Sequence, residues 1–398
     1  MTLRQELFVL EKKKIVKEKP VLVCLKIAVI FILAAFLLSA ATGLSGCKSK
    51  DASGTVQESS AAIEETAPET AIATAETAPA ETTAIVEEEA ISDNINKFSG
   101  LELSDTVHNY RPLAIMVQNN PVARPHSGLI YADIVFEIVA EGGVTRFVTV
   151  YSSFDADIIG PVRSARIYFA EIARSLDPIY TFWGSYPQAY DAIKNMDMDV
   201  LDANSTAYVN YTSAGWRDRT RSDALEHTAF IDTEGIRKDG EKYGYSLEGG
   251  QSPLAFKIDA PEPERGNISE ITVNFSSESY VAGFVYDKET NKYLKSIAGA
   301  PHNDFETGQQ ISLNNVIVML TDIEGPIDQY GHMLARTTGT HNQGEAYYFM
   351  DGNVVEGTWA RNSIFDPFEF HDTEGNQVLF NRGSTWICII QSINRLMY

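Results

Sequence analysis

The feature that most limits how this chain can fold is a gap in its aromatic residues, because none occurs between Lys48 and Phe98. Residues 51–98 are mainly Ala, Thr, Glu, Ser and Pro, and they carry eleven acidic residues against the single base Lys97. Such a segment cannot bury enough apolar surface to fold, and its like charges extend it. We therefore expect a disordered acidic stalk over residues 47–98, followed by a folded region of about 300 residues.

The residues before the stalk have the order of an export signal, in which basic residues precede the apolar run from Ile27 to Ala41. The sequence Leu44-Ser45-Gly46-Cys47 then resembles the bacterial lipobox, where the Cys receives a diacylglyceryl group. We predict a signal peptide over residues 1–46 and a lipid on Cys47 that holds the protein on the extracytoplasmic face of the cell membrane. An uncleaved anchor that ends in a chance cysteine stays open as the alternative.

Cysteines and net charge restrict the chemistry of the mature chain. Cys24 lies in the predicted signal and Cys47 is the predicted lipid site, so Cys388 is the remaining thiol and no internal disulfide can form. Cys388 lies in a β-type apolar run and is expected to be a small core residue. The net charge of −22 opposes nucleic acid as a partner.

The first part of the folded region, residues 99–247, mixes strand and helix patterns. Apolar spacing predicts a helix from Ser164 to Leu176, which Asp177-Pro178 ends. A strand over 179–183 and a short helix over 187–196 follow. Three earlier strands are predicted at 112–117, 134–139 and 145–151.

The later part of the chain is dominated by strand-like runs. Residues 248–266 are rich in Gly, Pro and Glu and predict a linker, 267–390 predict a mostly β domain, and 391–398 form a tail. Asp351-Gly352 predicts a hairpin turn and Glu374-Gly375 another turn. We therefore expect an α+β fold, with a mixed sheet-and-helix N-terminal domain followed by a mostly β C-terminal domain. The predicted runs are 271–275, 281–286, 315–320, 346–350, 354–359, 378–380 and 386–390.

Several phrases between about Gly100 and Ile390 resemble the YerB-like family of bacterial lipoproteins. The resemblance implies a sandwich of sheets and helices, a lipid-anchored location and no established activity. The sequence departs from the family pattern at Leu294-Lys295, where an Arg is expected after the Tyr, and in its tail. The first departure puts a family role of that position in doubt. The phrases are Arg111-Pro112-Leu113-Ala114-Ile115-Met116-Val117, Ala132-Asp133-Ile134-Val135-Phe136-Glu137, Gly143-Val144-Thr145-Arg146, Gly160-Pro161-Val162-Arg163-Ser164-Ala165-Arg166, Pro301-His302-Asn303-Asp304 and Gly383-Ser384-Thr385-Trp386-Ile387.

Arg163 and Arg166 are the main candidates for a ligand site. If Gly160-Pro161 opens the predicted helix, both guanidinium groups lie on one side of its first turn. Cations there oppose the helix dipole unless an anion answers them. Two arginines beside free backbone amides suit a carboxylate or phosphate, and Arg146 could join them from a neighbouring strand.

An internal ion-pair network is the alternative reading of these arginines. Asp133, Glu137 and Glu141 are the acidic residues placed to answer them. The two hypotheses are compatible, because carboxylates can also orient arginines toward a ligand.

A second candidate is His302-Asn303-Asp304, with His227 or Glu226 from the first part of the chain. Imidazole plus carboxylate suits a divalent metal or an acid–base pair. The spacing fits no metal motif of known geometry, so we assign no metal, and a turn stabilised by Asp304 is the structural alternative. The aromatic strip 180–186 with Tyr190 either stacks on sugar rings or belongs to the core.

The sequence contains no nucleophile elbow, P-loop or dinucleotide fingerprint, so we expect no cofactor. The pattern favours an envelope module that binds an anionic or glycan ligand, such as a peptidoglycan carboxylate or a teichoic acid phosphate, or a protein partner. A wall-acting hydrolase or transferase stays open, with Glu137, Glu141 or Asp304 acting together with His302. A structural scaffold is a third hypothesis.

Overall fold

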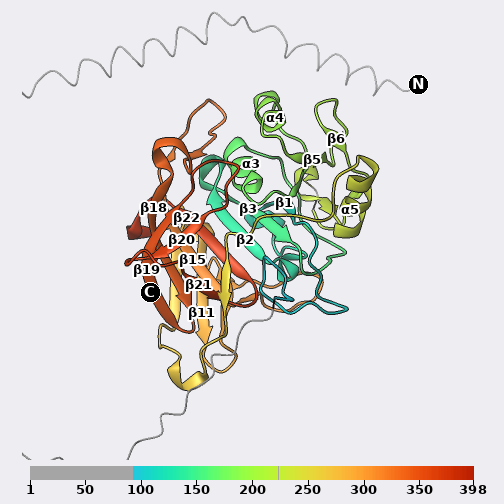
Figure 1. Cartoon of the computed structure of the whole chain (residues 1–398). Helices are drawn as coiled ribbons and strands as arrows, with labels where there is room; N and C mark the ends of the chain where they lie inside the picture. The colour runs from blue at the N-terminus through green and yellow to red at the C-terminus, as the bar shows by residue number, and fades with distance from the viewer. Residues whose placement is uncertain (1–92, 223) are drawn as a thin grey trace, which may run out of the picture. The chain divides into compact units, whose positions relative to one another are not determined.

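The computed structural model describes residues 93–222 and 224–398. The predicted signal peptide, Cys47 and nearly all of the stalk lie outside the described residues. An eleven-stranded sheet forms the centre of the fold (Figure 1), in the order β20-β19-β18-β15-β22-β2-β3-β1-β4-β5-β6. In that order the strands span Glu369–Asp372, Asn353–Ala360, Gln343–Met350, Asn315–Leu320, Thr385–Ile390, Ile134–Val139, Thr145–Tyr151, Leu113–Gln118, Ile179–Phe182, Asp199–Asp202 and Asn210–Tyr211.

Strands from both parts of the folded region meet in this sheet. β22 pairs in parallel with β2 on one side and with β15 on the other. Every residue of β2 and β22 is buried, as expected of continuous apolar runs whose two faces are both covered. The predicted fold class is confirmed, with helices in the first part and mostly strands in the second, and the large sheet joins the two parts.

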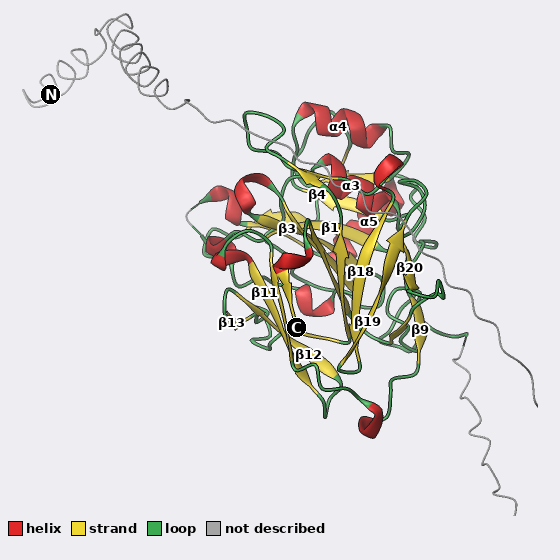
Figure 2. Ribbon diagram, turned by 90° about the vertical axis from the view of Figure 1, so that its left-hand side faces the viewer, coloured by secondary structure: helices red, strands yellow, loops and turns green. Residues whose placement is uncertain are grey.

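Different elements cover the two faces of the large sheet (Figure 2). Met116 of β1 packs in one apolar cluster with Phe169 of helix α3 (Ile167–Arg174). Its neighbour Ile115 points the other way, because side chains alternate along a strand, and it shares a second cluster with Ile236 of α5 (Thr233–Lys242). Helix α4 (Pro187–Lys194) also covers the first face through Tyr190.

A six-stranded sheet packs on the same side as α5, in the order β13-β12-β11-β10-β23, with β14 beside β12. In that order these strands span Ala300–Pro301, Lys292–Ile297, Val281–Asp287, Glu270–Asn274, Leu396–Met397 and, for β14, Ser312–Leu313. Three two-stranded ladders complete the fold. They are β16 (Ile323–Glu324) with β17 (Leu334–Ala335), β21 (Leu379–Asn381) with β9 (Ala255–Lys257), and β7 (Gly215–Arg217) with β8 (Ala229–Ile231).

The predicted linker and the predicted tail both contain strands. β9 lies within the predicted linker, and β23 lies within the predicted tail and pairs with β10. The turn at Asp351-Gly352 joins β18 to β19 as predicted. Helix α5 and strand β12 were not predicted, since α5 is mostly polar and its start is marked by a single cap, Asp232, which accepts from the Gly235 amide.

The helix expected from Ser164 begins instead at Ile167. Gly160-Pro161 does not open it, because the chain before the helix is used for sheet-like pairing. Gly160 bridges Ser127, and the Val162 amide donates to the Ala229 carbonyl at 2.7 Å. Within the described residues, no helix has the length and apolar character needed to cross a membrane.

Candidate functional site

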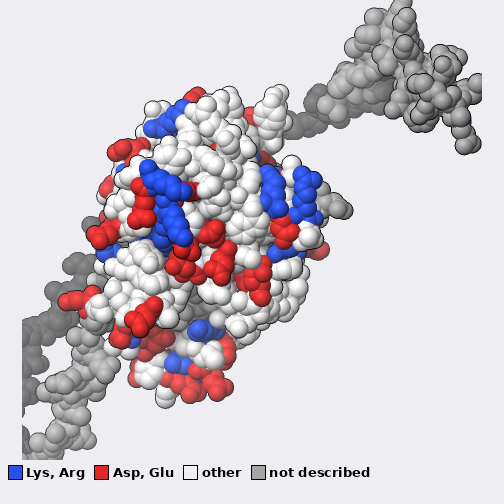
Figure 3. All heavy atoms as spheres, turned by 90° about the vertical axis from the view of Figure 1, so that its right-hand side faces the viewer, with Lys and Arg blue, Asp and Glu red and all other residues white. Residues whose placement is uncertain are grey.

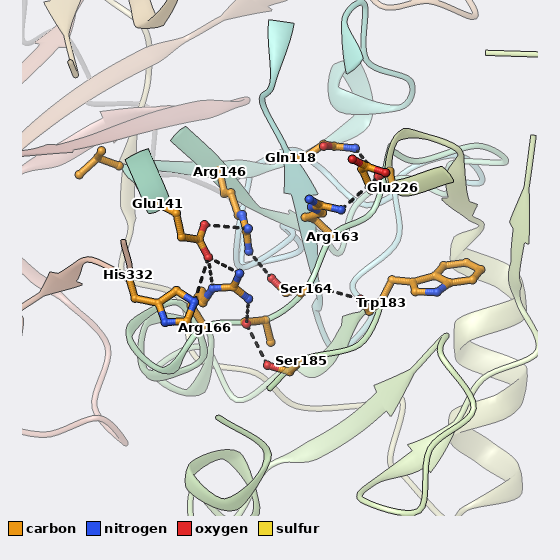
Figure 4. Close-up of polar contacts among 12 residues, drawn as sticks. Gln118, Glu141, Arg146, Arg163, Ser164, Arg166, Trp183, Ser185, Glu226 and His332 are labelled. Atoms are coloured by element: carbon orange, nitrogen blue, oxygen red, sulfur yellow. Dashed lines mark hydrogen bonds and ion pairs between the residues drawn. The ribbon is translucent and has the colours of Figure 1, made fainter. Parts of the chain in front are cut away.

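Arg163 and Arg166 lie on the extended segment that leads into α3. The Arg163 amide donates to the Met116 carbonyl of β1 at 2.8 Å, and Arg166 is the residue before the first helical turn. The prediction that both arginines lie in that first turn is therefore wrong. The two side chains diverge, with Arg166 directed toward Glu141 and Arg163 toward Glu226 (Figure 4).

Glu141 forms ion pairs with two of the three candidate arginines, Arg146 and Arg166. It sits in a 3-10 turn (Glu141–Gly143) between β2 and β3, next to the start of the strand that carries Arg146. Arg146 Nη2 donates to Glu141 Oε2 at 2.8 Å, and Arg166 contacts Glu141 Oε1 through Nε and Nη2. The ion-pair network proposed from the sequence exists, with Glu141 as its centre.

Asp133 and Glu137 form no ion pair with the three arginines, so the prediction that they belong to the same network is wrong. The Asp133 carboxylate accepts from the backbone amides of Ser152 and Ser153 at 2.6 and 2.9 Å. Burial raises the pKa of Asp133 to about 6, against these hydrogen bonds.

Glu137 belongs to a separate buried network, because its side chain points into the core of the sheet. It accepts from Thr145 Oγ1 at 2.8 Å and from the Trp386 indole at 3.0 Å. The ammonium of Lys295 lies 3.9 Å from Glu137 Oε2, and the two side chains are 0% and 1% exposed. Lys295 is therefore buried in the core beside the Glu137 carboxylate.

The arginines line an open cleft of about 1210 Å³. This volume exceeds the ~300–1,000 Å³ usual for small-molecule sites. Three arginines and two carboxylates supply its fixed charges, so the arginine cleft is locally cationic in an acidic protein. These residues are Arg146, Arg163, Arg166, Glu141 and Asp328. Figure 3 illustrates on one face how basic clusters stand beside acidic ones despite the net charge.

Arg163 is the cation of the cleft that has no ion pair. Among the described residues, no carboxylate oxygen lies within 4.0 Å of its guanidinium. Its one side-chain hydrogen bond is to the Glu226 carbonyl, at 3.5 Å. A guanidinium carries five N–H donors, so most donors of Arg163 are free to bind a ligand from the cleft.

The charges of the cleft also shift each other's pKa values. Burial lowers the pKa of Arg146 to about 10, and the nearby Arg166 acts in the same direction while Glu141 opposes it. Although burial works against ionisation of Glu141, Arg146 and Arg166 hold the pKa of that carboxyl below its ordinary value. Glu141 is therefore an anion at neutral pH.

The loop between β16 and β17 also lines the cleft, and sequence reasoning missed it. His332 of this loop stacks on Tyr186 with ring centroids 4.8 Å apart. Its Nδ1 lies 2.5 Å from Asp328 Oδ2, and its Nε2 lies 3.5 Å from Glu141 Oε1. The loop has no repeating pattern in the sequence, and only the fold brings it to the arginines.

His302, Asp304 and His227 each contact different partners. His302 is buried and its Nε2 lies 2.9 Å from Nδ1 of His126, a residue that sequence reasoning did not single out. Asp304 accepts from the Gly128 amide at 2.6 Å and from its own turn, as the structural alternative predicted. His227 contacts Gln118 Oε1 at 2.8 Å. Among the described residues no group of His, Cys, Asp and Glu has the arrangement of a metal site.

The aromatic strip and Cys388 prove to be core. Tyr180, Phe182 and Tyr190 are at most 2% exposed, so they cannot stack on sugars, and Tyr186 alone reaches the cleft. Cys388 is fully buried, and this burial raises the pKa of its thiol well above the ordinary value. It is an inert core residue, as predicted.

Two family models match this chain, one in each part of the folded region. Residues 98–246 match the family described as "Protein of unknown function (DUF3048) N-terminal domain", and residues 271–387 match the corresponding C-terminal domain. This chain belongs to that family. The resemblance to YerB-like proteins in the sequence is thereby confirmed.

Two findings concern the YerB protein of Bacillus subtilis. YerB of strain 168, named as a candidate lipoprotein, is 29% identical over 317 residues, which cover 77% of this chain and 91% of YerB. A crystal structure of the YerB protein matches with a TM-score of 0.66 at 28% identity, covering 76% of this chain and 98% of that chain. The two proteins therefore share their fold over most of this chain.

Proposed function

We propose that this protein is a lipid-anchored binding module of the cell envelope, and that the arginine cleft binds an anionic group of its ligand. The observation that carries the proposal is Arg163, whose guanidinium lines an open cleft without a carboxylate partner among the described residues. An unpaired arginine that is more than half buried has lost much of its hydration. A bound carboxylate or phosphate restores that loss through paired, charge-assisted hydrogen bonds.

Glu141 stabilises the cleft while no ligand is bound. It pairs with Arg146 and Arg166 and neutralises part of their charge. The cleft then retains one net positive charge from its fixed groups, against the net −22 of the protein. Screening over about 8 Å at physiological salt lets this local charge act on a ligand.

The sequence around Cys47 and the relative named as a candidate lipoprotein support this location. A lipid on Cys47 places the cleft outside the cytoplasm at the end of the acidic stalk, where the anions available are peptidoglycan carboxylates, teichoic acid phosphates and acidic envelope proteins. Mass spectrometry of the N-terminal peptide tests this directly. We expect a chain that begins at Cys47 and carries the mass of a diacylglyceryl group, and an unmodified Cys47 would contradict the proposal.

The carboxylates of the cleft do not have the properties that the alternative function, a hydrolase, needs. A glycosidase needs a general acid whose pKa is raised. Arginines hold the pKa of Glu141 below its ordinary value, against burial, and the His332 contacts lower that of Asp328 in the same way. Glu137 and Asp304, the other proposed catalytic carboxylates, are buried outside the cleft.

Anion binding can be measured by calorimetric titration of the full-length protein in detergent with inorganic phosphate at pH 7. We expect saturable binding that weakens with salt and is reduced about tenfold in Arg163→Ala, the effect of losing ~1.5 kcal/mol of charge-assisted hydrogen bonding. Arg382→Ala is the matched control, because Arg382 pairs only loosely with Glu102 at 3.7 Å and does not line the cleft. Equal affinity in all three proteins would refute the proposal.

A further inference from the structure

The loop between β16 and β17 brings an aromatic ring to the cleft on which no other ring stacks among the described residues. Tyr330, at the tip of the loop between β16 and β17, is 71% exposed, and Ile327 beside it is 52% exposed. Both line the cleft. Tyr330 approaches His332 only at a tilted 6.0 Å, and its hydroxyl makes no hydrogen bond to a described residue.

The neighbouring Tyr186 differs, because its ring is already covered. His332 stacks on one side of Tyr186, and the Arg166 guanidinium lies 5.6 Å from the ring centroid. Tyr330 is thus the ring of the cleft that is left with an open face. An exposed aromatic side chain in a concave site is a typical platform for a flat, partly apolar ligand surface.

The lining of the cleft also includes neutral hydrogen-bonding groups. Gln188 and Gln329 are exposed, and neither side chain forms a hydrogen bond with a described residue. Ser164 and Ser185 add hydroxyls whose own protons are donated to backbone carbonyls, which leaves their oxygens able to accept. Amides and hydroxyls at this density suit a ligand that carries many hydroxyl groups.

We infer that the ligand of the cleft is an anionic glycan, with a sugar ring on Tyr330 and its phosphate or carboxylate on Arg163. This inference rests on the proposed function and adds the ring to the anion. The open cleft of about 1210 Å³ has room for more than one sugar unit. A simple anion would leave Tyr330, Gln188 and Gln329 without a role, whereas a glycan uses all three.

Four probes separate the parts of the inference in titrations of the full-length protein in detergent. They are inorganic phosphate, N-acetylglucosamine, N-acetylglucosamine 1-phosphate and N-acetylmuramic acid. We expect the sugar phosphate or the carboxylate-bearing sugar to bind at least about tenfold more tightly than phosphate, the gain from one ring contact of ~1.4 kcal/mol. The better of the two identifies the anion of the natural glycan.

Substitutions then assign each contact. Tyr330→Ala should remove the tenfold advantage of the sugar probe and leave phosphate affinity within about twofold, while Tyr330→Phe should keep the advantage. Arg163→Ala should weaken phosphate and sugar phosphate alike. Tyr131→Ala is the control, because Tyr131 is 38% exposed and lies outside the cleft.

The outcomes distinguish failure of the inference from failure of the proposed function. If phosphate binds through Arg163 but the charged sugars bind no better than phosphate, or Tyr330→Ala leaves their advantage intact, the glycan inference is wrong and anion binding stands. If no anionic probe binds, both are wrong.

Discussion

The arginine cleft and the buried network around Glu137 both combine cations with carboxylates, and they differ in whether every charge has a partner. The buried network around Glu137 and Lys295 is closed, because the two side chains are 1% and 0% exposed and Glu137 accepts from Thr145, Asn119 and Trp386. The arginine cleft is open, and Arg163 has no carboxylate partner among the described residues. The buried network therefore stabilises the fold, whereas the guanidinium of Arg163 is available to bind an anion in the cleft.

The largest expected effect comes from opening the buried network. Glu137→Ala leaves the Lys295 ammonium buried without its counter-ion, so we expect a loss of about 3–5 kcal/mol in the free energy of unfolding. Urea denaturation of the full-length protein in detergent measures it. Adding Lys295→Met should recover part of the loss, and a loss below ~1 kcal/mol in Glu137→Ala would show that the network is not closed.

The buried histidines give the next largest effect, as a dependence of stability on pH. Burial lowers the pKa of His126 from 6.5 to about 3, the contact with the Gln118 carbonyl opposes this, and nearby Arg124 and Lys295 add to it. Because the folded pKa is depressed, the unfolded chain binds more protons between these values. Stability is thus fully present above pH 6.5 and is lost as the pH falls toward 3, on the order of 3 kcal/mol by pH 4.

His126→Gln isolates this contribution. The variant should lose less stability than the natural protein between pH 6.5 and pH 4 in urea denaturation. Asp133 acts in the opposite direction, since its pKa is raised to about 6 by burial and the fold gains stability as that carboxyl protonates. Asp133 is present in both proteins, so its contribution cancels when the change in the free energy of unfolding with pH is compared between them. Parallel pH profiles would contradict the prediction.

In the cleft, substitutions should change binding more than folding. Arg163→Ala should reduce phosphate affinity about tenfold and change the free energy of unfolding by less than ~0.5 kcal/mol, since Arg163 has one long hydrogen bond to lose. Calorimetry and urea denaturation of the same samples measure both. A loss of several kcal/mol in stability would make Arg163 a structural residue and remove the contrast with the buried network.

The smallest expected effect is an increase in affinity. Glu141→Gln removes the anion that competes for Arg146 and Arg166, and a unit charge ~5 Å away in water is worth ~0.8 kcal/mol, or about fourfold in affinity. Phosphate should therefore bind about fourfold more tightly to this variant. Weaker binding would mean that Glu141 is needed to position the arginines for the ligand.

The sequence predicted more of the fold than of the site. The runs of β-branched and aromatic residues located most strands of the large sheet, and the turn at Asp351-Gly352 was evident because its chemistry is local. Glu137 and Glu141 are four residues apart and looked equivalent. Their roles differ because the indole of Trp386, 249 positions further along, donates a hydrogen bond to Glu137. Glu141 instead contacts Arg166 and His332. Contacts this distant leave no local pattern.

The central claim is that Arg163 holds an anion in the cleft, and diffraction from crystals soaked in tungstate tests it most directly. Tungstate is a tetrahedral oxyanion like phosphate, and its position is located by its anomalous scattering. The account predicts a peak inside the cleft, within hydrogen-bond reach of the Arg163 guanidinium, that is absent from Arg163→Ala crystals. Tungstate bound only elsewhere, with the cleft empty and accessible in the crystal, would contradict it.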